Sequence, residues 1–173
     1  QLGDAFNALR LGVSVPAEHL AHLRSAAAGV GFHGFFGFDP RTSPPPLPSN
    51  RPPLAAHASR WDVWQHALIL GYVCERLHAD CGASYFDVLK WLPQLKQLEP
   101  LRPPPTAGGE GGWGVYAAQL SALTHVVYTL ADYAQLRLEA ALLPEEVGFL
   151  HRALEVSVRQ LKLPEAVREI ADC

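Results

Sequence analysis

Two segments of the chain are so rich in proline that neither can form a regular helix or an internal strand. Residues 40–53, PRTSPPPLPSNRPP, contain seven prolines, and residues 100–114, PLRPPPTAGGEGGWG, are rich first in proline and then in glycine. Proline fixes φ and lacks a backbone N–H, so such segments are extended, and glycine adds flexibility. We therefore predict loops or linkers at 40–53 and 100–114, which separate an N-terminal part from two helix pairs.

Helix-start signals recur along the rest of the chain. Serine followed three residues later by aspartate, as at Ser59 and Ser84, is a capping-box variant, and proline followed by glutamate marks a first helical turn. These signals predict helices that begin near Pro16, Ser59, Ser84, Pro144 and Pro164. The first should end at residues 29–31, the third should kink or restart at Pro93, and the longest helical pattern covers about residues 115–142.

No segment alternates with period two for long enough to predict a strand. The fold class that follows is all-α, with antiparallel helix pairs packed as a bundle or a short α-solenoid. A length of 173 residues predicts a single helical domain over 1–173. The chain opens QLGDAF without Met, which is compatible with a fragment or a processed product of a longer chain.

Composition excludes some partners. The 14 Lys and Arg residues are scattered and the net charge is −3, so no basic patch is available for nucleic acid. Residues 111–131 carry no charge and are long enough to span a bilayer. Polar side chains at Gln119, Thr124, His125 and Thr129 argue against a membrane span and favour burial within a helical core.

The chain has three cysteines, Cys74, Cys81 and Cys173, which form no CxxC pair. An odd count without such a pair is more typical of an intracellular, reducing compartment than of a disulfide scaffold. The seven-residue spacing of Cys74 and Cys81 across a helix exit also argues against a zinc pair.

The stretch SALTHVVYTLADY carries the most informative polar pattern. His125, Tyr128, Thr129 and Asp132 stand at i, i+3, i+4 and i+7, which predicts one uncharged polar stripe on a helix until Asp132 is reached. This polar stripe can face water, form a structural hydrogen-bond network, or line a ligand or catalytic site. The opposite side of the same helix is apolar, with Leu123, Val126, Val127 and Leu130.

A second histidine, His66, follows Asp62 by one helical turn, and the other neighbours on its helix are apolar. Asp62 can fix the imidazole tautomer, as structural, metal-ligating and general-base histidines all require. If the two helices face each other, His66, His125 and Asp132 supply two nitrogens and a carboxylate, a set that suits a divalent transition metal such as Zn or Fe. Tyr128 would then be a proton donor, and without a metal His125 and Asp132 are candidates for an acid–base couple.

Two further segments each have a structural and a functional interpretation. The four phenylalanines of GVGFHGFFGFDP, residues 29–40, predict a loop anchored in the core, which would also suit a pocket lid. The proline run in 40–53 is either a spacer or a ligand for a polyproline-reading domain.

At WDVWQHALILGYVCE, ASYFDVLKWLP and LTHVVYTLADY the chain resembles an uncharacterised group of helical proteins from plants and bacteria. The resemblance covers roughly the last two-thirds of the chain. It implies an all-α domain, and it carries no activity and no functional residue with it.

These observations lead to two hypotheses for function. The first is a helical interaction or structural domain with a protein partner, since helix pairs, proline-rich arms and uncharged helix faces suit protein contact. The alternative is a small-molecule or metal-dependent enzyme that uses a pocket of His66, His125 and Asp132.

Overall fold

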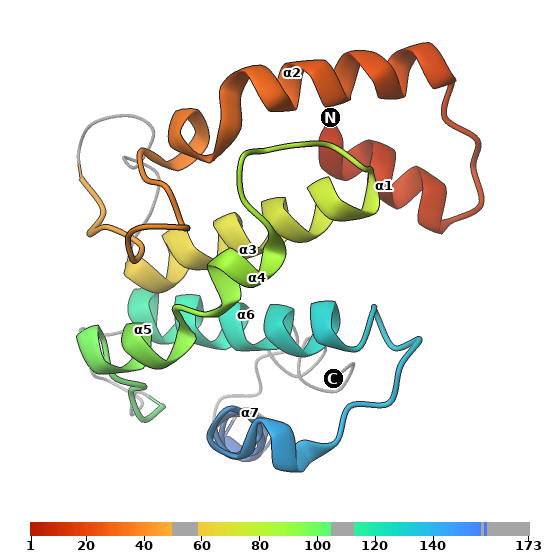
Figure 1. The fold of residues 1–173 in the computed structure, drawn as a ribbon. Coiled ribbons are helices and arrows are strands. Elements are labelled where there is room, and N and C mark those ends of the chain that lie inside the picture. The colour runs from red at the N-terminus through yellow and green to blue at the C-terminus, as the bar shows by residue number, and fades with distance from the viewer. Residues whose placement is uncertain (50–58, 105–112, 157, 159–173) are drawn as a thin grey trace. The chain divides into compact units, whose positions relative to one another are not determined.

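The computed structural model describes residues 1–49, 59–104, 113–156 and 158, and every regular element within them is helical. The predicted all-α fold class is therefore confirmed for this part of the chain (Figure 1). The elements are α1 (Leu2–Arg10), α2 (Ala17–Phe36), α3 (Arg60–Arg76), α4 (Tyr85–Leu89), α5 (Leu92–Leu98), α6 (Trp113–Leu130), the 3₁₀ helix η2 (Ala140–Leu142) and α7 (Pro144–Val156).

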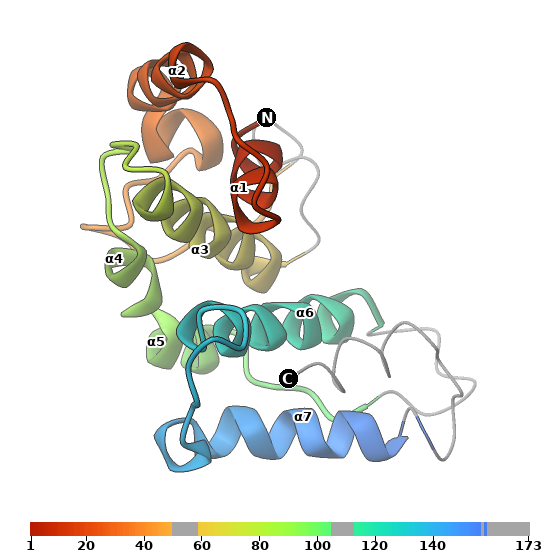
Figure 2. The same cartoon turned by 90° about the vertical axis from the view of Figure 1, so that its right-hand side faces the viewer.

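The chain divides into two compact units, residues 1–98 and residues 99–173. The first unit contains α1 to α5, and α3 packs against α1, α2 and α4; the second contains α6, η2 and α7, and α7 packs against α6. In the first unit α2 and α3 run antiparallel (Figure 1), and in the second unit α7 runs back against the direction of α6, at an angle to it (Figure 2). Antiparallel helix pairs are thus confirmed, and the single domain expected from the length stays a prediction.

Aromatic side chains on α3 form the centre of the first unit. Trp61 and Trp64 are fully buried, and the Trp64 indole N–H donates to the Val88 carbonyl at 2.9 Å. A side chain on Gly71 would come within 3.1 Å of the Tyr85 Cα. Glycine at this position therefore allows α3 and the start of α4 to approach closely.

The predicted helix starts at Ser59 and Ser84 are confirmed. The Ser59 hydroxyl accepts the Asp62 backbone N–H at 3.2 Å, and Ser84 forms a complete capping box with Asp87. The same hydrogen bonds from the Ser84 backbone and hydroxyl lower the pKa of Asp87, because they stabilise its charged form. The predicted restart near Pro93 is also confirmed, since α4 ends at Leu89 and α5 begins at Leu92.

The first long helix does not end at residues 29–31 as predicted. Gly31 adopts φ 59°, a left-handed conformation that kinks α2, and the helix then resumes to Phe36. The Phe32 backbone N–H, which the kink removes from the helix ladder, donates to the Cys81 carbonyl at 3.0 Å. Three of the four phenylalanines predicted to anchor this segment are buried: Phe32, Phe36 and Phe38.

The helix predicted over 115–142 ends at Leu130, so this boundary was wrong. The Tyr133 N–H donates to the Tyr128 carbonyl at 2.6 Å, and the Asp132 N–H donates to the Thr129 carbonyl at 3.3 Å. With Asp132 at φ 48°, these are the two hydrogen bonds and the left-handed residue of a Schellman motif. The motif satisfies the last carbonyls of α6 and turns the chain away.

The same motif ends α3, with His78 at φ 53° as its left-handed residue. The chain then reverses and brings Cys81 back to Cys74, and the two form a disulfide with a Cα–Cα distance of 6.5 Å. This disulfide was not predicted, and it does not support the reducing compartment that the cysteine count suggested.

Parts of both proline-rich segments can be described. Residues 40–49 pack on the first unit and residues 100–104 on the second, while residues 50–53 and 105–112 and the helix predicted at Pro164 lie outside the described residues. In the second unit, the fully buried Gln119 amide accepts from the Arg102 N–H and donates to the Pro100 carbonyl, both at 2.9 Å. These two hydrogen bonds fasten residues 100–102 to α6. Among the described helices, none combines the length and hydropathy needed to cross a membrane.

Candidate functional site

The polar stripe predicted on α6 is sheltered from solvent on its helical part. Thr129 is 5% exposed, and His125 and Tyr128 are half-buried. The rings of His125 and Tyr128 pack edge to face with centroids 6.1 Å apart, and Tyr133 stacks on Tyr128 at 5.9 Å. This side of α6 is therefore packed rather than fully hydrated.

The polar groups of this stripe bond back to their own helix. The His125 Nδ1 lies 2.8 Å from the Ser121 carbonyl oxygen, and the Thr129 hydroxyl donates to the His125 carbonyl at 2.6 Å. A carbonyl only accepts, so Nδ1 carries the proton of His125 and Nε2 is the acceptor in the neutral ring. In the described part of the chain, every buried side-chain nitrogen or oxygen has a hydrogen-bond partner. Of the three interpretations of the stripe, these contacts favour the structural hydrogen-bond network.

Asp132 does not belong to the helical stripe. It lies beyond Leu130, the last residue of α6, in the Schellman turn. The backbone there is left-handed, so Asp132 does not occupy the i+7 position on the helix surface. The shared helical face that suggested an acid–base couple of Asp132 with His125 is therefore absent, and a catalytic role for either residue stays a prediction.

His66 is more exposed than its apolar neighbours suggested, since 51% of its side chain is accessible. The predicted contact with Asp62 is confirmed: Nδ1 lies 2.8 Å from the Asp62 carbonyl oxygen and 3.3 Å from its carboxylate. His66 belongs to the first unit, and His125 and Asp132 belong to the second. Over residues 1–49, 59–104 and 113–156, no group of three His, Cys, Asp or Glu side chains could hold a metal ion, so the set predicted for Zn or Fe receives no support.

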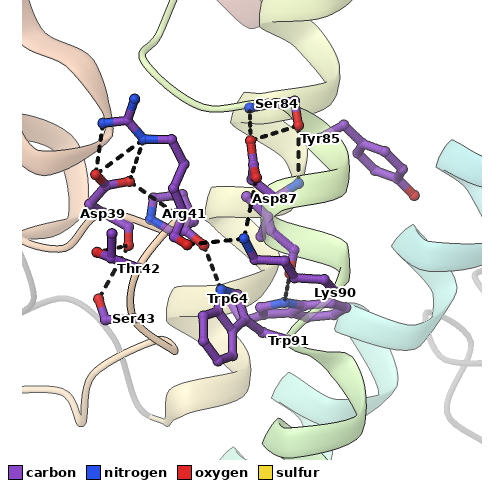
Figure 3. Close-up of polar contacts among 12 residues, drawn as sticks. Asp39, Arg41, Thr42, Ser43, Trp64, Ser84, Tyr85, Asp87, Lys90 and Trp91 are labelled. Carbon is purple, nitrogen blue, oxygen red and sulfur yellow. Dashed lines mark hydrogen bonds and ion pairs between the residues drawn. The ribbon is translucent and has the colours of Figure 1, made fainter.

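A set of polar contacts in the first unit joins the proline-rich segment to the helices (Figure 3). We call residues 39–49 the arm. Three side chains, from the start of α3 and the turn between α4 and α5, donate to its backbone carbonyls. The Trp91 indole N–H donates to Pro40 O at 2.6 Å, Arg60 to Pro45 O at 2.6 Å, and Lys90 to Arg41 O at 3.1 Å.

The arm is also packed and not only hydrogen-bonded. Pro40 and Pro45 are each less than 2% exposed, whereas Leu47 is 63% exposed. The arm is therefore buried at Pro40 and Pro45 and is exposed again at Leu47. Neither predicted interpretation of the segment, a spacer or a ligand for another domain, includes this docking within the chain.

A tight turn at the start of the arm fixes its direction. The Asp39 carbonyl accepts from the backbone N–H and the hydroxyl of both Thr42 and Ser43. The Asp39 carboxylate binds the Arg41 guanidinium through two oxygens, at 2.8 to 3.2 Å (Figure 3). Hydrogen bonds from the Arg41 side chain and backbone lower the pKa of Asp39 to about 2.

Arg60, Lys90 and Trp91 form what we call the donor face. Arg60 donates to a carbonyl of the proline run, whose acceptors no regular ladder occupies, and Lys90 and Trp91 donate to carbonyls of the turn that begins the arm. An aromatic N–H and flanking cations that hydrogen-bond to such carbonyls are the groups with which proteins recognise proline-rich peptides. Sequence reasoning missed this face because no local spacing connects Pro40 with Trp91, which are 51 residues apart.

Comparison of the chain with protein-family models, with curated proteins and with solved structures gives no match.

Proposed function

We propose that the chain is a helical protein-interaction module whose donor face binds proline-rich segments, with the arm as the resident intramolecular ligand. The observation that supports this proposal is the set of three hydrogen bonds from Trp91, Arg60 and Lys90 to arm carbonyls. Recognition through the backbone carbonyls of a ligand depends little on the ligand's side chains. A proline-rich segment of a partner can therefore accept hydrogen bonds from the same donors.

Competition between the arm and a partner follows from this arrangement. A tethered segment has an effective concentration in the millimolar range, so a free peptide exchanges with it only weakly. Weakening the hold of the arm should therefore expose the donor face. Pro40 and Pro45 are the positions to change, because they are the buried residues of the arm and do not belong to the donor face.

The test measures binding of a labelled synthetic peptide with the sequence of residues 39–48 to the full chain by fluorescence anisotropy. We expect the variant with Pro40→Ala and Pro45→Ala to bind the peptide at least tenfold more tightly than the wild type, because the competitor in the same chain is weakened. Adding Trp91→Phe to that variant removes one donor and should reduce the affinity again, whereas Trp113→Phe in the second unit serves as the matched control. Equal affinity of the wild type and the arm variant would contradict the proposal.

A second measurement locates the binding site in the variant with Pro40→Ala and Pro45→Ala, in which the arm competes less. The Trp91 indole N–H resonance should move when the peptide is added in excess, and the resonance of Trp113 should not. A Trp91 resonance that does not respond to saturating peptide would count against the donor face as the binding site.

The alternative hypothesis, a metal-dependent enzyme built on His66, His125 and Asp132, is not favoured by any contact among the described residues.

A further inference from the structure

The second unit has a hollow that its own side chains leave unfilled. Residues of the last turn of α6 and of the segment that follows line it, and its volume is about 490 Å³. Small-molecule sites in proteins usually measure about 300 to 1000 Å³, so this volume suits a small ligand. The hollow lies wholly within the second unit and does not involve the arm or the donor face.

The lining of this hollow combines apolar side chains with the polar Tyr128 and Gln135 and the charged Arg137. Its apolar part includes Val127 of α6, Ala131 just beyond the helix, and Leu136 and Leu138 of the following segment. Leu136 is 61% exposed, which is costly for a large apolar side chain unless something covers it. Arg137 stands between the two leucines in the chain and also lines the hollow.

Arg137 is the group that determines which ligand fits. Among the described residues it makes no hydrogen bond and no ion pair. An arginine beside an apolar wall offers a planar fork of donors that matches a carboxylate or a phosphate through two hydrogen bonds. The ligand should therefore combine an anionic group with an apolar body.

The surrounding charges decide between the two anions. The hollow adjoins the C-terminal end of α6, which carries the negative end of the helix dipole. Asp132 and Glu139 add negative charge on either side of the lining segment in the sequence. A doubly charged phosphate is repelled more strongly by these groups than a singly charged carboxylate.

We infer that this hollow binds a small amphipathic carboxylate, with the carboxylate on Arg137 and the apolar chain between Val127, Ala131 and Leu136. This inference does not depend on the proposed function, because the two sites share no residue.

Octanoate is the probe for the test, and binding to the full chain is followed by isothermal titration calorimetry. We expect saturable binding that falls about tenfold with Arg137→Ala, since a charge-assisted pair of hydrogen bonds is lost. Arg152→Ala changes an exposed arginine of α7 in the same unit and should leave the affinity unchanged. Octan-1-ol and octylammonium have the same apolar chain without a negative charge and should bind more weakly than octanoate.

Amide chemical shifts locate the binding site in the same titration. Changes should concentrate at residues 127–138, and the resonances of the first unit should not move. Octan-1-ol binding as tightly as octanoate, an unaffected Arg137→Ala variant, or shifts centred elsewhere would each overturn the inference.

Discussion

Asp39 keeps its charge to low pH because Arg41 binds both of its carboxylate oxygens. The pKa of Asp39 in the folded protein, about 2, lies below the unfolded value of 3.8. The ion pair therefore stabilises the folded state above about pH 4, and this contribution is lost as the pH falls from about 4 to about 2. Both side chains are hydrated, so the contribution is small.

A carboxyl titration followed by ¹³C NMR checks this ion pair directly. In Arg41→Gln the pKa of Asp39 should rise toward 3.8, because the guanidinium that stabilises the carboxylate is removed. Arg10→Gln, in the last turn of α1, is the control and should leave the Asp39 titration unchanged, since Arg10 is not among the groups that shift it. An unaltered titration in Arg41→Gln would show that the pair is not formed in solution.

Gln119 is a second residue whose surroundings predict a measurable effect. Its buried amide holds the Arg102 N–H and the Pro100 carbonyl, so Gln119→Leu should reduce the free energy of unfolding by about 1 to 3 kcal/mol. Urea denaturation followed by circular dichroism measures this loss. Gln97→Leu, at an exposed position of α5, should change stability little.

Hydrogen exchange provides a local check on the same substitution. The Arg102 amide should exchange faster in Gln119→Leu than in the wild type, because its acceptor has been removed. If exchange at Arg102 were the same in both proteins, the Gln119 side chain would not be the group that fastens this segment.

At the level of helices, the sequence predicted the starts better than the ends. Ser59 and Ser84 each cap a helix together with an aspartate three positions later. Because this pattern is short, the helix starts can be identified from the sequence. The ends of α3 and α6 use Schellman turns, whose left-handed position is usually glycine. In this chain His78 and Asp132 occupy the left-handed position, and neither residue type is a usual signal for a helix end. For this reason the sequence pattern predicts that α6 continues beyond Leu130.

The left-handed turns make a prediction about stability. His78→Gly should raise the free energy of unfolding by up to about 1 kcal/mol, since the relief of a left-handed backbone exceeds the entropy that glycine adds to the unfolded chain. Thermal and urea denaturation measure the gain. His22→Gly, at an exposed position inside α2, is the matched control and should destabilise the protein, because glycine is a poor helix former.

Substitutions at Asp132 test whether the turn that ends α6 constrains this position. If Asp132 serves only to end α6, Asp132→Gly should be at least as stable as the wild type and Asp132→Val clearly less stable, because a β-branched residue is poorly tolerated at positive φ. A wild-type stability for Asp132→Val would mean that the turn does not constrain this position.

For the whole molecule, the sequence predicted the class of fold and missed the contacts that suggest function. Helical periodicity and capping are local signals, and they gave the antiparallel helix pairs. The donor face joins residues of α3 and the α4–α5 turn to a segment that precedes both, and the disulfide depends on a chain reversal at His78. Such contacts depend on how elements pack, and no residue pattern along the chain contains that information.

The Cys74–Cys81 disulfide makes the stability of the first unit depend on the redox conditions. It closes a short loop across the end of α3, and its removal should cost about 2 to 3 kcal/mol by restoring freedom to the unfolded chain. Cys81 also supplies the carbonyl that accepts the Phe32 N–H, so the loss extends to the kink of α2. Three of the four tryptophans lie in the first unit, which makes tryptophan fluorescence a reporter of its unfolding.

Urea denaturation with and without a reductant tests this dependence. Dithiothreitol should lower the midpoint of the wild-type protein to that of a variant with Cys74→Ala and Cys81→Ala, and it should not affect that variant. A change at Cys173 alone should leave the response to reductant intact, since the pair that responds is Cys74 and Cys81. A wild-type midpoint that is the same under oxidising and reducing conditions would show that the two thiols are not joined. In that case the reducing compartment suggested by the cysteine count would regain its support.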